Sequence, residues 1–180
     1  IAMNKLVIST LESRYRLYDM RTYHPVHGYS FLSQAAHEST VWSVRHLPQN
    51  RDVFMTTGGN GSLELWKYSY PSQRKIKEKD GHEKGVLSLK LLGDMLYAGD
   101  RKGEIKLWKV GPGPDQHTCK GTLAGHKGAI WMLQYDEEIG RLYSCCDDKK
   151  VIAWDVAQLR QVKAFDAHKD KVYREALFLD

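Results

Sequence analysis

Few residues in this 180-residue sequence combine the residue types and the spacing that site chemistry requires. His24 and His27 could bind a metal ion, but a proline follows the first and no acidic residue or cysteine stands beside them, so a loop is the better interpretation. Cys145 and Cys146 are adjacent in a predicted strand, where neighbouring side chains point to opposite faces. No glycine-rich phosphate loop or G-x-S-x-G segment occurs. We therefore predict no catalytic residue, no metal site and no cofactor.

Other histidines belong to a long repeat. A small residue precedes a histidine four times, at His37, His82, His126 and His168. These histidines recur at intervals of 45, 44 and 42 residues. An aromatic residue also closes a short alternating segment four times, at Tyr18, Trp66, Trp108 and Trp154. Two interleaved markers with one period predict a repeat architecture.

Each repeat contains short segments rich in β-branched and aromatic residues, separated by turn residues, which predicts antiparallel β-strands. The main strands are expected at 41–47, 53–57, 62–68, 85–91, 95–98, 104–110, 129–135, 141–145 and 151–156. Less regular outer strands are expected near 28–33, 119–123 and 161–165. No segment shows a helical period over 11 residues or more, so the predicted fold class is all-β.

The period, the Gly-His pairs and the strand-closing tryptophans resemble the WD-repeat family along the whole chain. This resemblance implies a WD-repeat β-propeller with about four repeat units, either closed on itself or forming part of a larger propeller. It also implies a buried relay of hydrogen bonds in each blade, made by a His, a Ser or Thr, a Trp and an Asp.

The most complete relay is expected from His126, Ser144, Asp148 and Trp154. The resemblance assigns five further relay positions, at His37, Trp66, His82, Trp108 and His168. Asn60 and Lys102 occupy positions where the family has Asp, so the repeat with Lys102 is expected to be the weakest.

A second set of positions suggests protein binding. It lies five residues after each repeated histidine, at Trp42, Leu87, Trp131 and Tyr173. In the family this part of the innermost strand begins at the rim where partners dock, and aromatic side chains are frequent anchors of interfaces. Lys127 would add a charge beside Trp131. Packing between neighbouring blades is the alternative interpretation of these residues.

Residues 1 to about 80 resemble one group more closely, the Monad family of axonemal dynein assembly factors. The resemblance rests on Tyr18–Thr22 followed by His24–Pro25, and on the segment HLPQNR at 46–51. It implies partners of three kinds: RuvB-like ATPases, prefoldin-like subunits and dynein chains. The resemblance fades after about Lys75, and ordinary WD-repeat units continue from Gly85 to the end.

Composition excludes several other classes of function. The formal charge is +5, but basic and acidic residues are interspersed, which does not favour a nucleic-acid-binding stripe. No apolar run approaches the roughly 20 residues that span a bilayer, and the first residues do not resemble a secretory signal. Three cysteines without C-x-x-C spacing fit a reducing compartment. We expect a cytoplasmic protein that binds neither nucleic acid nor membrane.

The ends of the chain bear on its domain organisation. The sequence begins within one repeat, near 5–10, and ends within another, near 171–179, so the two ends could share a blade. We expect one propeller or propeller segment over 1–180, with Monad-like units at 1–80 and generic units at 81–180. A four-unit ring, half of an eight-bladed dimer and a fragment of a larger or chimeric propeller all remain open.

The expected function is a non-catalytic protein-protein interaction scaffold, with a co-chaperone adaptor in axonemal dynein preassembly as the specific form. The alternative is a substrate receptor of a cullin-type ubiquitin ligase. Asp19 and Arg21 are similar to the W-D-x-R motif of such receptors, although Tyr18 replaces its tryptophan.

Overall fold

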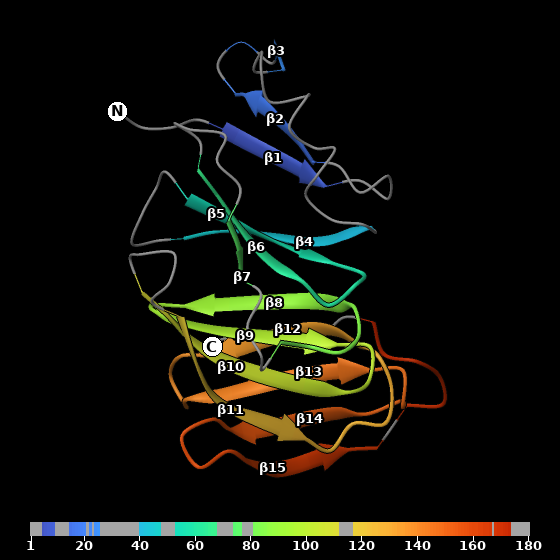
Figure 1. The fold of residues 1–180 in the computed structure, drawn as a ribbon. Helices are drawn as coiled ribbons and strands as arrows, with labels where there is room; N and C mark the ends of the chain where they lie inside the picture. The colour runs from blue at the N-terminus through green and yellow to red at the C-terminus, as the bar shows by residue number, and fades with distance from the viewer. Residues whose placement is uncertain are drawn as a thin grey trace. The chain divides into compact units, whose positions relative to one another are not determined.

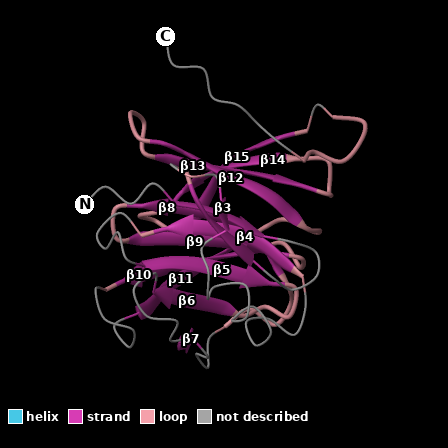
Figure 2. Ribbon diagram, turned by 90° about the horizontal axis from the view of Figure 1, so that it is seen from above, coloured by secondary structure: helices cyan, strands magenta, loops and turns pink. Residues whose placement is uncertain are grey.

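The computed structural model describes residues 5–9, 15–20, 22, 24–25, 40–47, 53–67, 74–76, 81–111, 117–166 and 168–173. All regular structure in these ranges is β-strand (Figure 2). The chain divides into two compact units, residues 1–86 and 87–180, which are described separately below. This result confirms the predicted all-β class.

The first unit contains two antiparallel sheets. Strands β1 (Lys5–Ser9), β2 (Tyr15–Asp19) and β3 (His24–Pro25) form a three-stranded sheet in chain order. Strands β4 (Val41–His46), β5 (Val53–Gly58), β6 (Leu63–Lys67) and β7 (Arg74–Ile76) form a four-stranded sheet, also in chain order. Every residue of β5, one of the two inner strands, is buried.

The second unit contains two four-stranded sheets of the same design. One comprises β8 (Val86–Leu92), β9 (Met95–Asp100), β10 (Glu104–Val110) and β11 (His117–Ala124). The other comprises β12 (Ile130–Asp136), β13 (Arg141–Cys146), β14 (Val151–Asp155) and β15 (Arg160–Phe165). The two sheets are stacked (Figure 1), and the core between them includes Leu107, Leu133 and Trp154. Antiparallel strands joined in chain order by short turns form such blades, and their inner strands are buried along most of their length.

Nearly every predicted strand lies within a few residues of an observed one. The outer segments 119–123 and 161–165 fall within β11 and β15. Strand β7 was not predicted, because its three residues are too few to show an alternating pattern. The predicted outer strand at 28–33 lies outside the described residues, and the described part of 171–179 contains no strand.

One turn position has the same backbone conformation in all three four-stranded sheets. It lies between the second and third strands, five residues before the tryptophan. Gly61 and Gly103 occupy it with φ of 86° and 95°, and Lys149 occupies it with φ of 70°. Positive φ is strained for a residue with a side chain, so glycine is favoured at the first two positions.

Candidate functional site

Four side chains from the last sheet form a continuous hydrogen-bonded relay. The Nδ1 atom of His126 lies 2.9 Å from Oδ2 of Asp148. The Nε2 atom of His126 lies 2.7 Å from the Ser144 hydroxyl oxygen. That oxygen also accepts a hydrogen bond of 2.7 Å from the indole N–H of Trp154. Ser144 is 0 % exposed and Trp154 1 %, so the relay is a buried polar network in which each member satisfies another.

The network defines the proton positions. Trp154 can only donate, so the Ser144 oxygen accepts from it and its own hydroxyl proton is available to His126 Nε2. His126 then carries its proton on Nδ1 and donates it to Asp148. The relay thus places neutral hydrogen-bonding groups in the core and the carboxylate at its outer end, where Asp148 has 11 % of its side chain exposed.

The charge on Asp148 is stabilised by its hydrogen bonds. Burial by itself would raise the pKa of this carboxyl, but the backbone N–H of Lys127 and the imidazole of His126 outweigh that effect and lower the pKa below 3.8. Its other oxygen accepts from the backbone N–H of Lys150 at 3.2 Å. The carboxylate therefore ties the loop before β12 to the turn between β13 and β14.

This lowered pKa predicts how stability depends on acid. The unfolded chain takes up the Asp148 proton at a higher pH than the folded chain, so the stabilisation is present above about pH 3.8 and is lost as the pH falls further. We expect Asp148→Asn to be less stable than wild type at neutral pH and to lose less stability on acidification. Denaturant unfolding at several pH values measures this. Asp166→Asn, which removes the exposed partner of Lys150, is the control and should retain the wild-type slope.

The sheet β4–β7 contains a shorter version of the relay. The indole N–H of Trp66 donates to the Thr56 hydroxyl at 2.8 Å, and both side chains are buried. Asn60 replaces the aspartate, and its side-chain oxygen accepts from the backbone N–H of Ser62 at 3.2 Å and from its hydroxyl at 2.8 Å. His37 lies outside the described residues.

The sheet β8–β11 uses a different carboxylate. Lys102 occupies the aspartate position, but Asp100, two residues earlier, accepts backbone N–H groups of Lys102, Gly103 and Glu104 at 2.8 to 3.0 Å. The turn is therefore well capped despite Lys102. The hydrogen bond that this sheet lacks is the one from its tryptophan. Ala98 occupies the position of Ser144 and Thr56, ten residues before the tryptophan, and within the described ranges the indole nitrogen of Trp108 has no hydrogen-bond acceptor.

A hydroxyl at position 98 is expected to repair this defect. Ala98→Ser should raise the free energy of unfolding by about 1 kcal/mol, because a buried N–H gains an acceptor. Thermal and urea unfolding measure the change. In a Trp108→Phe background, which has no indole N–H, the same serine should give no gain. An equal gain in both backgrounds would show that the hydroxyl does not act through Trp108.

Two further histidines differ in environment. His82 is buried, with 6 % of its surface exposed. His168 is exposed, in contrast to its predicted place in a buried relay. The described residues around His168, 168–173, contain no strand that would cover the ring.

Two of the predicted partner-binding positions, Trp131 and Tyr173, contact each other and two charged residues in the second unit. Asp147 accepts the indole N–H of Trp131 at 2.6 Å and lies 3.1 Å from the amino group of Lys171. The Trp131 and Tyr173 rings are 5.5 Å apart with planes tilted by 60°. Tyr173 is 54 % exposed and Trp131 is partly buried. We call Trp131, Asp147, Lys171 and Tyr173 the rim cluster.

The other two predicted positions differ from this pair. Trp42 is partly buried in β4. Leu87 is only 6 % exposed, so its side chain belongs to the core and offers no surface to a partner. An aliphatic residue at an inner-strand position is better accommodated by packing than by solvent, which agrees with the alternative interpretation of these positions.

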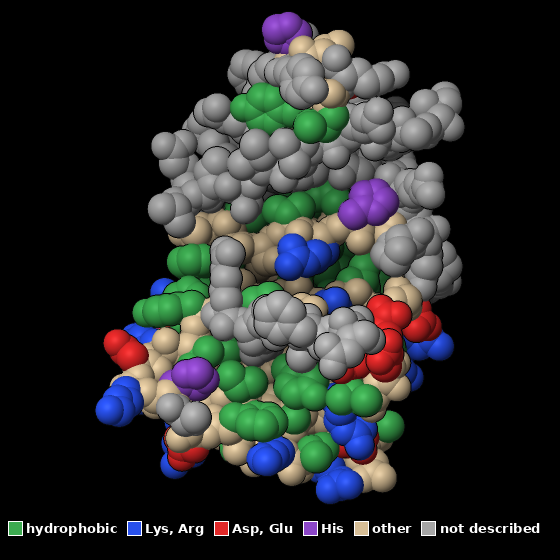
Figure 3. Space-filling view, turned by 180° about the vertical axis from the view of Figure 1, so that it is seen from behind, with side chains coloured by type: hydrophobic (Ala, Val, Ile, Leu, Met, Phe, Trp, Pro, Cys, Tyr) green, Lys and Arg blue, Asp and Glu red, His purple; other side chains and the backbone are tan. Residues whose placement is uncertain are grey.

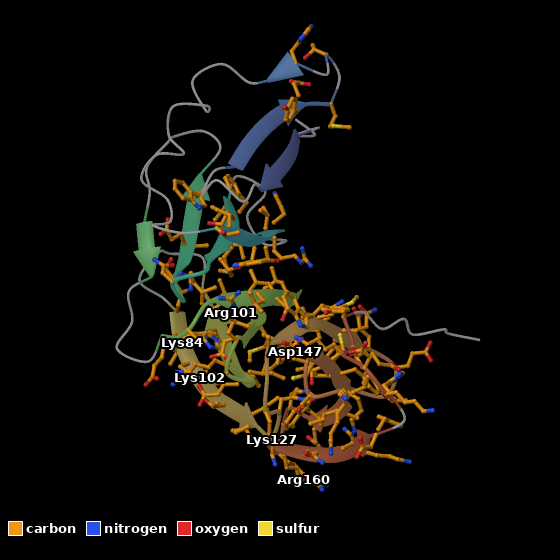
Figure 4. The ribbon with its side chains drawn as sticks, turned by 90° about the vertical axis from the view of Figure 1, so that its right-hand side faces the viewer. Lys84, Arg101, Lys102, Lys127, Asp147 and Arg160 are labelled. Carbon is orange, nitrogen blue, oxygen red and sulfur yellow. The ribbon has the colours of Figure 1, made fainter. Side chains whose placement is uncertain are left out.

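Exposed basic residues lie on two neighbouring turns of the same unit. Arg101 and Lys102 lie on the turn between β9 and β10, and Lys127 lies on the loop before β12 (Figure 4). A Cβ placed on Gly103 would lie 2.6 Å from the His126 carbonyl oxygen, so these two segments are in contact. Asp100, which ends β9, and Asp148, on the turn between β13 and β14, accept backbone N–H groups. On the face shown in Figure 3, by contrast, basic and acidic side chains are interspersed.

The structure adds no functional contact to the remaining sequence motifs in the ranges that it describes. Asp19 ends β2 and pairs with His24 in β3, whereas Arg21 and His27 lie outside the described residues. Cys145 and Cys146 are buried and Cys119 is partly buried, all with free thiols. No helix in the described ranges is long and apolar enough to cross a membrane.

Sequence reasoning missed Asp100, Asp147 and Thr56. Thr56 was detectable, because it precedes its tryptophan by the same ten residues as Ser144. Asp147 was obscured by the adjacent Asp148, which matches the family pattern.

Comparisons with known proteins agree with this geometry. The family model of the WD domain, G-beta repeat, matches residues 28–67 and 117–155. Dynein axonemal assembly factor 10 of Xenopus laevis is 50 % identical over 114 residues, covering 57 % of this chain and 32 % of that protein. The protein of the same name from Bos taurus is 59 % identical over 86 residues, covering 48 % of this chain and 24 % of that protein. The matches thus span about a third or less of the relatives.

Among solved structures, a chain in the crystal structure of the mitotic checkpoint complex superposes with a TM-score of 0.77. It is 20 % identical and the match covers 95 % of this chain and 49 % of that chain, so the likeness shows the fold alone. The resemblance of the first half to the Monad-like assembly factors is confirmed by the named relatives. Together with the four-stranded blades and their Trp-centred hydrogen bonds, these matches show that the chain contains WD repeats and has the WD-repeat β-propeller fold.

Proposed function

We propose that this chain is a non-catalytic protein-binding scaffold that acts in the cytoplasmic assembly of axonemal dynein. The observation that carries the proposal is the 50 to 59 % identity to proteins named dynein axonemal assembly factor 10. The WD repeats support a scaffold rather than a catalyst, because their histidines and aspartates serve hydrogen bonds that hold the blades. Co-chaperone proteins, specifically RuvB-like ATPases with prefoldin-like subunits, are the proposed partners.

The proposed contact surface combines the rim cluster with three exposed bases of the same unit, Arg101, Lys102 and Lys127. Trp131 and Tyr173 form an aromatic pair, and an aromatic side chain held in one orientation loses little conformational entropy on binding. Asp147 provides that orientation by accepting the Trp131 indole N–H while it also binds Lys171. Lys127, Arg101 and Lys102 would favour a partner surface with acidic residues.

The test compares three variants of the aromatic pair. Trp131→Ala should weaken binding of the purified RuvB-like and prefoldin-like complex about tenfold or more, since it removes one ring and the support of the other. Tyr173→Ala should weaken binding with little change in melting temperature, because that side chain is 54 % exposed. Trp131→Phe keeps a ring and should retain most of the affinity.

Calorimetric titration and a thermal melt of each variant separate binding from stability. Thr118→Ala, at an exposed position of β11, is the matched control. Equal affinity of wild type and both alanine variants would contradict the rim cluster as the contact surface. No measurable binding by wild type would contradict the choice of partner.

A further inference from the structure

Strand β15 forms one edge of the last sheet and carries exposed apolar side chains. In the described ranges only β14 pairs with it, so the outer row of its backbone N–H and C=O groups has no partner strand there (Figure 1). On β15 and the turn before it, Leu159, Val162 and Phe165 are 41 %, 45 % and 39 % exposed. Single exposed hydrophobic residues are common, whereas three along one strand edge favour a contact surface.

The other outer strands lack this feature. The exposed side chains of β11 are those of Thr118, Lys120, Thr122 and Ala124, and none of them is a large hydrophobic residue. Strands β3 and β7 have only two and three residues and are too short to offer an edge. The apolar edge therefore distinguishes β15 from the other outer strands that the structure describes.

The turn before β15 holds the start of this edge in one conformation. The Asp155 carboxylate accepts the backbone N–H groups of Ala157 and Gln158 at 3.1 and 3.0 Å. Leu159 follows with a φ of 50°, a left-handed conformation that is strained for a residue with a side chain. Its side chain lies over Gly121 of β11, where a Cβ would come within 2.5 Å of the Leu159 Cδ1 atom. An edge that is ordered before binding loses less conformational entropy when a partner strand pairs with it.

The charges of β15 favour an acidic partner segment. Arg160 and Lys163 lie opposite two residues of β14 that are two positions apart, so both bases stand on the same face of the sheet. Both are exposed, and β15 contains no acidic residue. Lys163 lies 5.2 Å from the centre of the Phe165 ring and Arg160 donates to the Gln158 side chain, but neither forms an ion pair in the described ranges. Acidic groups of a partner would complement this pair of bases.

A second copy of this chain is a poorer occupant of the edge. Antiparallel pairing of two β15 strands would bring together two bases from each copy and no acidic residue. Like charges across neighbouring strands are destabilising, and basic residues on an edge strand hinder pairing with an edge of the same charge. A segment with acidic residues meets no such penalty.

We propose that β15 is a second docking edge, to which an extended partner segment of alternating apolar and acidic residues adds as a fifth strand. Its acidic side chains face Arg160 and Lys163, and its apolar side chains lie on the opposite face, beside Leu159. Backbone hydrogen bonds supply affinity and the two sets of side chains supply specificity. Strands β12 and β15 are opposite edges of the sheet, so this surface is separate from Trp131 of the rim cluster.

The probe is a synthetic peptide of about nine residues that alternates valine and glutamate, with both ends blocked. Titrated into the ¹⁵N-labelled full chain, it should shift the backbone amide resonances of residues 159–165 and leave those of β12 unchanged. A peptide of alternating valine and lysine should bind about tenfold more weakly or worse.

Two further peptides test whether binding is strand pairing. One carries N-methyl groups on every valine nitrogen and the other on every glutamate nitrogen, and alternate N–H groups of a strand point to opposite edges. Only the peptide whose unblocked edge faces β15 should bind.

Charge-reversal variants locate the contact. Arg160→Glu combined with Lys163→Glu should weaken binding of the glutamate peptide about tenfold or more and should favour the lysine peptide instead. Lys120→Glu, on the exposed side of β11, is the matched control, and Tyr173→Ala removes a ring of the rim cluster. Both should retain wild-type affinity for the peptide. All four residues are exposed, so thermal melts of these variants should match that of wild type.

Four outcomes would overturn the proposal. They are no binding of the glutamate peptide by wild type, equal binding of the two methylated peptides, an equal loss of affinity in Lys120→Glu, and self-association through the edge. Light scattering detects the last of these, as a wild-type dimer that Val162→Lys converts to a monomer. That result would assign the edge to a second copy of the chain.

Discussion

Ser144→Ala is expected to lower the free energy of unfolding by about 3 to 5 kcal/mol, since two buried partners lose their hydrogen bonds at once. The Ser144 oxygen accepts from Trp154 and contacts His126 Nε2, each at 2.7 Å. Both rings are buried in the structure, so removal of the hydroxyl leaves each without that hydrogen-bond partner. An unsatisfied buried donor or acceptor costs about 1 to 3 kcal/mol, so two together account for the expected effect.

Urea unfolding followed by tryptophan fluorescence and circular dichroism measures this loss. Ser88→Ala is the matched control, because the buried Ser88 hydroxyl makes one hydrogen bond, to the Ile130 carbonyl at 3.0 Å, and its loss should cost about 1 kcal/mol. Ser144→Thr should recover most of the stability, as Thr56 holds Trp66 at the same position in the β4–β7 sheet. A loss for Ser144→Ala no larger than for Ser88→Ala would contradict the relay as a source of stability.

Gly103→Ala is expected to lower the free energy of unfolding by about 2 to 5 kcal/mol, through two effects that act together. Gly103 has a φ of 95°, which residues with a side chain rarely adopt. A Cβ there would also lie 2.6 Å from the His126 carbonyl oxygen and 2.8 Å from its carbonyl carbon. Because those atoms are backbone at the start of the relay loop, relief of the contact would displace His126 from Ser144.

Two substitutions separate the backbone effect from the contact. Gly93 also has positive φ, 55°, but nothing lies within 4 Å of a Cβ built there, so Gly93→Ala should cost only about 1 kcal/mol. Lys149 occupies the turn position of Gly103 in the neighbouring sheet with φ of 70°, so Lys149→Gly should be neutral or slightly stabilising. Equal losses in Gly103→Ala and Gly93→Ala, measured by urea unfolding, would show that the contact with His126 has no effect.

The blade architecture could be predicted from the sequence because the same signals occur in several repeats. The marker histidines and the strand-closing aromatics have nearly the same period, and each repeat separately shows strand and turn signals. The relay of the last sheet was also anticipated at residue level, since His126, Ser144, Asp148 and Trp154 all match one family pattern. These features depend on spacing within one repeat, and spacing is what a sequence displays.

Positions where this sequence differs from the family's relay pattern could not be interpreted from spacing alone. Lys102 at the aspartate position suggested a weak turn, yet Asp100 caps that turn from two residues earlier. The structure located the defect at Ala98 instead, beside the indole of Trp108. A residue type at one position does not show whether a neighbour performs the missing role, because hydrogen bonds depend on distance and direction.

The repeat length, the strand order and the residues of one relay follow from the sequence alone. The folded structure was needed to show that Leu87 is buried, that Asp147 contacts both Trp131 and Lys171, and that Cys146 lies beside His126 and Asp148. One cause accounts for all three. Burial and side-chain contacts arise between elements that are separated along the chain, and their geometry is set by how the strands stack and where each turn directs its side chains.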